Sequence, residues 1–140
     1  NDVRNFGAII RTAEVSGVDA IIIQNQSSAP INADTVKTSA GGVFNVPICK
    51  VSHIKDAIYH LKSSKISVIA TSEKAEKNIY DLSLKKSVAI IMGSEERGIS
   101  SSVLKLSDEM VKLPIFGEIE SLNVSVATGI FLYEVIRQRI

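Results

Sequence analysis

Cysteine and aromatic residues are scarce in this chain of 140 residues. It contains one cysteine, Cys49, no tryptophan, three tyrosines and four phenylalanines. A single cysteine excludes an internal disulfide and is typical of a reducing compartment, so we expect a cytoplasmic protein. The hydrophobic fraction is nevertheless 45%. Together with the many Ile, Val and Ala residues, this fraction favours an α/β layered fold over a small disulfide scaffold.

Strong charge and long hydrophobic runs are also absent. The formal net charge is +1, which is too small to indicate nucleic-acid binding by itself. A local basic patch could still bind nucleic acid. No apolar run approaches the length that crosses a bilayer and no signal peptide is evident, so we expect no membrane association. Residues 1–5 resemble the end of a loop, and we therefore expect that the preceding strand and any N-terminal domain are missing.

Short apolar runs alternate with helical patterns along the chain. The predicted strands are Ala20–Ile23, Ile48–Val51, Ile66–Thr71, Ser87–Met92 and Met110–Leu113, and the predicted helices are Gly7–Ser16, Asp34–Thr38, His53–Ser63, a short one from Ser100 and a long one from Leu122. This alternation predicts an α/β fold with a mostly parallel sheet and helices on both faces. We expect the charged segment Ser72–Lys86 to be solvated, with Ile79, Tyr80 and Leu82 as its anchors. We expect Cys49, in a strand, to be buried.

The most apolar segment follows Leu122. Its apolar residues surround the predicted helix: Val124, Val126, Ala127, Ile130, Phe131, Leu132, Val135 and Ile136. Such a helix is covered on most sides. Because the chain is short, we expect a second copy to supply part of that cover in a homodimer. The polar residues Ser121, Asn123 and Ser125 precede or open the helix, where N–H groups are unpaired, and they form either a cap or a ligand site.

Ligands of parallel sheets bind beyond the carboxyl ends of the strands. Three loops fall there: Asn5–Gly7, Gly93–Gly98 and Pro114–Asn123. Taken singly, the glycines are more often a plain turn, because neither GxGxxG nor GK[ST] spacing is present. Ser121 and Asn123 are more often a helix cap, and Arg11 a surface ion-pair partner. His53 and His60 have no acidic or cysteine partners at ligand spacing, so we expect no metal site.

Three motifs carry more information together than separately. They are Asn5-Phe6-Gly7-Ala8-Ile9-Ile10-Arg11-Thr12-Ala13, Gly93-Ser94-Glu95-Glu96-Arg97-Gly98-Ile99-Ser100, and Leu113 through Glu134. In this order they closely resemble the signature motifs of the SpoU (TrmH) family of RNA ribose 2'-O-methyltransferases, in the SPOUT superfamily. The resemblance spans nearly the whole chain, and the last motif is too long for coincidence.

The resemblance implies a fold that the strand and helix pattern does not predict. Members have the SPOUT α/β-knot, in which the C-terminal segment threads through a loop as a deep trefoil knot. Residues 1–140 would form a single methyltransferase domain, with the C-terminal helix packed against its twin in a homodimer. S-adenosyl-L-methionine binds in the knot. By position, Gly93, Leu113 and Leu122 would hold it and Ile115 would line its pocket.

The family's catalytic residues correspond to Asn5, Arg11, Glu95, Ser121 and Asn123. The reaction requires a ribose 2'-hydroxyl, a weak nucleophile, to attack a methyl group on a sulfonium. Arg11 is the proposed base of the family, but an arginine stays protonated, so we expect it to orient a phosphate and stabilise the developing alkoxide. Asn5, Ser121 and Asn123 would orient Arg11 and the ribose. Glu95 would fix the knot loops.

Two further segments indicate the RNA. The ending SVATGIFLYEVIRQR and the stretch Asn32–Gly42 are most similar to the branch that methylates a guanosine ribose in 23S ribosomal RNA. That branch carries a small N-terminal RNA-binding domain, which this chain would lack along with its first strand. Candidate RNA contacts in what remains are Arg4, Arg11, Lys37 and Arg97. Asp2-Val3-Arg4 stands where many members have Asp-Pro, a difference in loop geometry.

Other functions compete with this one. A tRNA ribose methyltransferase would carry basic terminal extensions, whereas this chain ends just after Arg139. A catalytically silent RNA- or nucleotide-binding module would not require the combination of Asn5, Arg11, Ser121 and Asn123. A dinucleotide-binding domain would carry the glycine fingerprint that is missing here. The sequence leaves the target nucleotide open.

Overall fold

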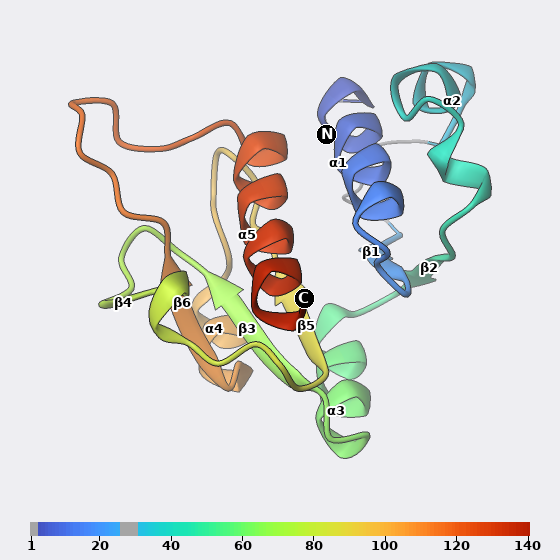
Figure 1. The fold of residues 1–140 in the computed structure, drawn as a ribbon. Helices are drawn as coiled ribbons and strands as arrows, with labels where there is room; N and C mark the ends of the chain where they lie inside the picture. The colour runs from blue at the N-terminus through green and yellow to red at the C-terminus, as the bar shows by residue number, and fades with distance from the viewer. Residues whose placement is uncertain (1–2, 26–30) are drawn as a thin grey trace. The chain divides into compact units, whose positions relative to one another are not determined.

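The computed structural model describes residues 3–25 and 31–140, which belong to two compact units, Asn1–Ile54 and Lys55–Ile140 (Figure 1). Each unit contains helices and a sheet of parallel strands. The α/β class with parallel strands is therefore confirmed. The described strands form two sheets, however, where the sequence predicted one, because hydrogen bonds join β1 to β2 and the other four strands to one another.

The first unit combines helices with a two-stranded sheet. Its elements are α1 (Val3–Val15), β1 (Ile21–Gln24), α2 (Ala33–Thr38), the 3-10 helix η1 (Gly42–Phe44) and β2 (Ile48–Val51). Strands β1 and β2 run parallel, with Ile21 beside Ile48. Helix α2 begins after Asn32 because the side-chain oxygen of this residue accepts hydrogen bonds from the N–H groups of Asp34 and Thr35.

Helix α1 approaches α2 and η1 closely at two glycines. A Cβ atom on Gly7 would overlap the hydroxyl oxygen of Thr38, so no larger residue fits between α1 and α2 without a shift. A Cβ atom on Gly42 would lie 3.5 Å from the Cα atom of Arg11. The backbone of η1 therefore lies directly against the middle of α1.

The second unit is built around four strands. Its elements are α3 (Ile54–Ser63), β3 (Ser67–Thr71), β4 (Lys77–Asn78), the 3-10 helix η2 (Ile79–Asp81), β5 (Val88–Ile91), α4 (Ser101–Leu106), β6 (Glu109–Lys112) and α5 (Val124–Arg139). Within the described residues the strand order is β4-β6-β3-β5, with parallel pairing throughout. Val68, Ile69 and Ala70 of β3 are fully buried, as a continuous apolar run in a central parallel strand should be.

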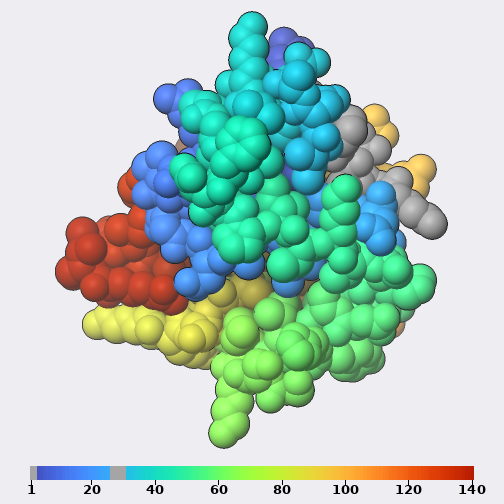
Figure 2. Space-filling view, turned by 90° about the vertical axis from the view of Figure 1, so that its right-hand side faces the viewer, coloured from blue at the N-terminus to red at the C-terminus, as the bar shows by residue number. Residues whose placement is uncertain are grey.

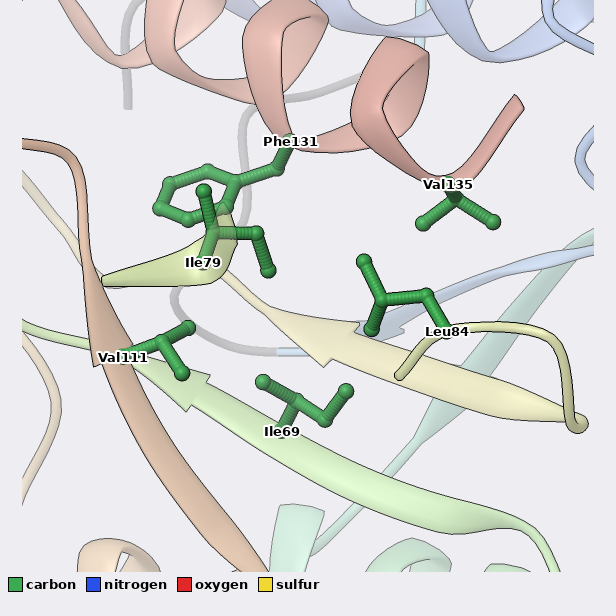
Figure 3. Close-up of a cluster of buried hydrophobic side chains, with 6 residues drawn as sticks. All are labelled: Ile69, Ile79, Leu84, Val111, Phe131 and Val135. Carbon is green, nitrogen blue, oxygen red and sulfur yellow. The ribbon is translucent and has the colours of Figure 1, made fainter. Parts of the chain in front are cut away.

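The core of this unit lies between the sheet and α5 (Figure 3). Its buried side chains are Ile69, Ile79, Leu84, Val111, Phe131 and Val135. Val68 and Ala70 point to the opposite face of the sheet and are also fully buried, so that face is covered too. Lys62 of α3 donates a hydrogen bond to the carbonyl of Leu106 at the end of α4, at 2.9 Å. These two helices lie on the side of the sheet away from α5 (Figure 1).

The charged segment Ser72–Lys86 is largely exposed, as the sequence predicted, and of its predicted anchors Ile79 is fully buried whereas Tyr80 is 50% exposed. A further anchor lies near its end. Leu84 is fully buried in the core. Gln138 of α5 donates to the carbonyl of Leu82 at 2.9 Å and accepts from the N–H of Leu84 at 2.7 Å. Arg139 donates to the carbonyl of Leu84 at 3.0 Å. The last turn of α5 therefore holds this segment through its backbone, which charge composition cannot reveal.

The cover of α5 and the burial of Cys49 were both predicted from the sequence. Within the single chain α5 buries one side, and Val126 and Tyr133 are 51% and 47% exposed, so the cover by a second copy stays a prediction. Cys49, expected to be buried, is exposed. It lies in β2, which pairs only with β1 among the described strands, and an edge strand of a small sheet has less cover than a central one.

Candidate functional site

A cavity of about 650 Å³ opens at the carboxyl ends of β3, β5 and β6, wholly within the second unit. Its wall is formed by residues 71–74 after β3, 92–99 after β5, 112–113 and Ile115 after β6, and 121–124 at the start of α5, together with Leu104, Ala127 and Phe131. This is where parallel sheets bind ligands. The volume is also typical of small-molecule sites, which measure about 300 to 1,000 Å³.

The loop after β5 closes tightly on itself. A Cβ atom on Gly93 would lie 2.5 Å from the carbonyl carbon of Gly98. The N–H of Gly98 donates to the carbonyl of Ser94 at 2.8 Å, and Gly98 has a φ of +64°, which favours glycine. The N–H of Arg97 donates to the hydroxyl of Ser94 at 3.1 Å. At Gly93, the cavity wall therefore consists of backbone alone.

The start of α5 forms the opposite wall. Asn123 caps the helix, since its side-chain oxygen accepts from the N–H groups of Ser125 at 2.9 Å and Val126 at 3.3 Å. Glu95, from the loop after β5, accepts from the N–H of Val124 at 3.5 Å. A carboxylate is favoured there because the first N–H groups of a helix carry partial positive charge. Glu95 thus joins the two loops that border the cavity.

The lining combines an apolar part with charges of both signs. The apolar side chains include Leu113, Ile115, Leu122 and Phe131, and the charged ones are Glu73, Lys74, Glu95, Glu96, Arg97 and Lys112. Phe131 also belongs to the core, so the apolar part of the wall is continuous with the interior. A cavity of this kind can hold a small molecule that has both apolar and charged parts.

Eight of the residues predicted for the site line this one cavity. They are Gly93, Glu95, Arg97, Leu113, Ile115, Ser121, Leu122 and Asn123. They come from the loop after β5 and from the segment between β6 and α5, which are far apart in the sequence. The structure therefore brings these residues together, and the role of each stays a prediction.

The other four predicted residues belong to the first unit. Helix α1 begins at Val3, so Asn5 lies inside the helix and not in the loop that the sequence predicted. No proline or glycine stands before Gly7 to delay the helix start. Arg4 and Arg11 are exposed and seven positions apart, which places them on the same side of α1. Lys37 is exposed on α2.

The sequence motifs do not include four parts of the cavity wall, which are Thr71–Lys74, Met92, Leu104 and Lys112. The hydroxyl of Thr71 donates to the carbonyl of Ile91 at 2.8 Å, which joins the ends of β3 and β5. The rule that selected the other loops, position at the carboxyl end of a parallel strand, also applies to Ser72–Lys74. Ser72–Lys74 was not selected because it opens a highly charged segment, which was interpreted as solvated.

Metal ligands and membrane spans were both expected to be absent. Among residues 3–25 and 31–140, no three His, Cys, Asp or Glu side chains gather in a group that could hold a metal ion. Over the same part of the chain, no helix combines the length and the apolar character needed to cross a bilayer.

Known sequences resemble the chain along almost all its length. Residues 1–133 match the model of the SpoU rRNA Methylase family. The 23S rRNA (guanosine-2'-O-)-methyltransferase RlmB of Vibrio vulnificus is 37% identical over 139 residues, which cover 99% of this chain and 56% of that protein. An uncharacterized tRNA/rRNA methyltransferase of Archaeoglobus fulgidus is 41% identical over 138 residues, 99% of this chain and 61% of that protein. The chain thus spans little more than half the length of these relatives.

Solved structures agree in fold. The AdoMet-bound rRNA methyltransferase from Sinorhizobium meliloti is 31% identical with a TM-score of 0.92, over 99% of this chain and 53% of that one. The TrmH/SpoU tRNA modifying enzyme of A. aeolicus is 31% identical with a TM-score of 0.89, over 99% and 70%. The methyltransferase AviRb from Streptomyces viridochromogenes, in complex with AdoMet, is 25% identical with a TM-score of 0.91, over 99% and 56%.

Proposed function

Since the chain belongs to the SpoU rRNA Methylase family, we propose that it transfers a methyl group from S-adenosyl-L-methionine to a ribose 2'-hydroxyl of RNA. The observation that carries this proposal is the gathering of eight predicted residues around one cavity at the carboxyl ends of parallel strands. The relative from V. vulnificus is named for methyl transfer to a guanosine 2'-oxygen. Two of the similar structures are described with AdoMet.

The cavity of the second unit suits the methyl donor. S-adenosyl-L-methionine would supply an electrophilic methyl group on a sulfonium. The wall at Gly93 is bare backbone, and a side chain there would collide with Gly98, so a ligand can approach the main chain closely. Leu113, Ile115 and Leu122 offer apolar surface for the adenine ring. The charged side chains of the wall can pair with the amino and carboxylate groups of the donor.

We assign the transfer step to Asn5, Arg11, Glu95, Ser121 and Asn123. The ribose 2'-oxygen would form a bond to the methyl carbon as the carbon–sulfur bond breaks, leaving S-adenosylhomocysteine, and the proton of the 2'-hydroxyl would pass to water. Arg11 keeps its own proton. Its guanidinium therefore orients a phosphate and stabilises negative charge on the 2'-oxygen. Asn5, in the same helix, orients Arg11, and Ser121 orients the ribose. Asn123 and Glu95 hold the start of α5, which follows Ser121.

A guanosine of 23S ribosomal RNA is the favoured target. The relative named above and the RlmB of Escherichia coli K12, 35% identical over 138 residues, carry that substrate in their names. A tRNA ribose is the alternative target. It is supported by the similar structure from A. aeolicus, which is named a tRNA modifying enzyme. Arg4, Lys37 and Arg97 are exposed cations and would contact phosphates in either RNA.

Assembly follows from the same proposal. Both units would belong to a single SPOUT methyltransferase domain whose C-terminal segment forms the trefoil knot. Helix α5 would form the homodimer interface, which the exposure of Val126 and Tyr133 supports. A reducing, cytoplasmic location suits an RNA-modifying protein with one free cysteine.

Calorimetric titration with S-adenosyl-L-methionine, S-adenosylhomocysteine and NAD tests the donor site. We expect the first two to bind and NAD not to bind. Transfer of tritium from labelled donor to deproteinised 23S rRNA, compared with bulk tRNA, then tests the reaction and its target. A folded protein that binds neither donor nor product would contradict the proposal. Labelling of tRNA alone would replace the ribosomal target by the alternative.

A further inference from the structure

Phe44 is an exposed aromatic side chain that the fold of the first unit does not use. It ends η1 and is 77% exposed. Val46, two positions later, is 5% exposed and supplies the apolar anchor of this turn. The other phenylalanine of the unit, Phe6, is partly buried. Val46 already anchors the chain here, so Phe44 is available for contact with a partner.

The turn that carries Phe44 is held firmly. Its N–H donates to the carbonyl of Gly41 at 3.0 Å, and the N–H of Val46 donates to the carbonyl of Gly42 at 3.2 Å. The backbone of Gly42 also lies against α1, where a Cβ atom would be 3.5 Å from the Cα of Arg11. Phe44 therefore stands on a fixed turn, two residues from a direct backbone contact with the predicted catalytic arginine.

The surroundings of Phe44 are suited to nucleic acid. Arg4 and Arg11 share one side of α1, and Lys37 is exposed on α2, all in the same unit. Figure 2 shows residues 31–50, in cyan to teal, at the surface of this unit. Exposed cations combined with an aromatic side chain are the usual means of binding unpaired RNA, because the cations hold phosphates and the ring stacks on a base.

We propose that Phe44 stacks on an unpaired base of the RNA substrate, beside the nucleotide whose ribose Arg11 approaches. This inference rests on the proposed function and adds a specificity-determining contact to it. A stacked base would fix the register of the RNA while Arg11 holds a phosphate. Methylation would then require an unpaired nucleotide near the target ribose.

A second copy of the chain could also cover an exposed phenylalanine, and Phe116 offers a useful comparison. Phe116 is 94% exposed, but Glu118 and Glu120, also exposed, follow it in the same loop and would repel phosphates. Arg11 and Lys37 lie in the same unit as Phe44, together with Glu14, whose Cβ would lie 3.4 Å from a Cβ added at Gly42. We therefore take RNA as the partner of Phe44. A change of oligomeric state in the Phe44→Ala variant would contradict this choice.

The absence of tryptophan from the sequence allows a direct test. Phe44→Trp places a single indole on η1, and Tyr59→Trp places one on α3, where the residue is 58% exposed. Both variants of the full chain are titrated with a short single-stranded RNA of mixed sequence and with its duplex. We expect the single strand to quench Phe44→Trp fluorescence strongly, the duplex to quench it little, and neither RNA to quench Tyr59→Trp.

Phe44→Ala provides the functional measurement. We expect it to weaken single-strand binding about tenfold, to raise KM for 23S rRNA more than it lowers kcat, and to leave the affinity for S-adenosyl-L-methionine unchanged. Phe44→Trp should restore RNA binding. Unfolding in urea should be unchanged, because the side chain is exposed.

Three results would overturn the inference. If the unaltered chain methylates RNA and Phe44→Ala binds and methylates it equally well, the stacking contact is wrong while the proposed function stands. If Phe44→Ala lowers the sedimentation mass, the residue belongs to an interface between copies. If the unaltered chain binds neither the donor nor RNA, the proposed function and this inference fail together.

Discussion

Gly93 and Gly98 are in such close backbone contact that a Cβ atom on Gly93 would lie 2.5 Å from the carbonyl carbon of Gly98 and 2.8 Å from its Cα. The contact closes the loop after β5 around the bridge between Ser94 and Gly98. It explains why this loop offers main-chain groups to the cavity and why residue 93 is glycine, whereas residue 98 is glycine because its φ is +64°. The sequence motif thus reflects a steric requirement.

Replacing Gly93 should therefore damage the cavity. We expect Gly93→Ala to weaken binding of S-adenosyl-L-methionine at least tenfold and to lower the free energy of unfolding by about 1 to 3 kcal/mol, because backbone must move to admit the methyl group. Gly117→Ala is the matched control, since no heavy atom lies within 4 Å of its added Cβ. Calorimetry and urea unfolding measure both effects. Equal donor affinity in the two variants would contradict the steric argument.

Glu134 should make stability depend on pH. Its side chain is 4% exposed and is held by Arg137 at 2.6 and 2.8 Å and by Gln138 at 2.8 Å. The hydrogen bonds from Arg137 lower the pKa of Glu134 below its usual 4.5, against the opposing effect of burial, and Gln138 assists. A lowered pKa in the folded state means that the stabilisation is present above pH 4.5 and is lost as the pH falls through the folded pKa.

The variant Glu134→Gln tests whether stability falls as the pH falls. We expect the variant to be less stable by about 1 to 3 kcal/mol at neutral pH, and the difference to shrink as the solution becomes more acidic than pH 4.5. Glu109→Gln is the control, because the Glu109–Lys77 pair lies at the surface and contributes at most about 1 kcal/mol. Urea unfolding at several pH values gives both curves. A Glu134→Gln difference that does not change with pH would show that the carboxylate is not linked to folding.

Arg11 should affect methyl transfer without affecting donor binding. It is exposed on α1, so Arg11→Ala should fold normally. We expect kcat to fall by about 10² to 10³ because charge on the 2'-oxygen loses its stabilising partner, while calorimetry shows unchanged affinity for S-adenosyl-L-methionine. Arg4→Ala, on the same side of α1, should raise KM for RNA and spare kcat. A loss of donor affinity that matches the loss of activity would contradict the role given to Arg11.

Val126 tests the homodimer. It is 51% exposed on α5, so a charge there should be tolerated by the single chain but should be costly in an apolar interface. We expect Val126→Asp to halve the mass in sedimentation while retaining the helical circular dichroism of the parent. Tyr59→Asp, at a residue that is 58% exposed on α3, should leave the mass unchanged. An unaltered mass for Val126→Asp would exclude this part of α5 from the interface.

Much of the molecule could be predicted because the relevant signals are local. Alternating apolar runs and helical patterns identified the parallel α/β class, since each element is a property of consecutive residues. The resemblance of the three motifs to the SpoU family pointed to residues that line the cavity, among them Gly93, Leu113 and Leu122. The role of each residue stays a prediction.

Other features depend on contacts between distant residues, and only the tertiary structure decided them. Leu84 is buried because Gln138, far along the chain, binds its backbone, although its own segment is highly charged. Thr71 joins the cavity wall because β3 lies beside β5 in the sheet. Phe44 is exposed and Val46 is buried in the same turn, although both are apolar. Residue type sets what a side chain can do, and the neighbours that folding brings to it decide what it does.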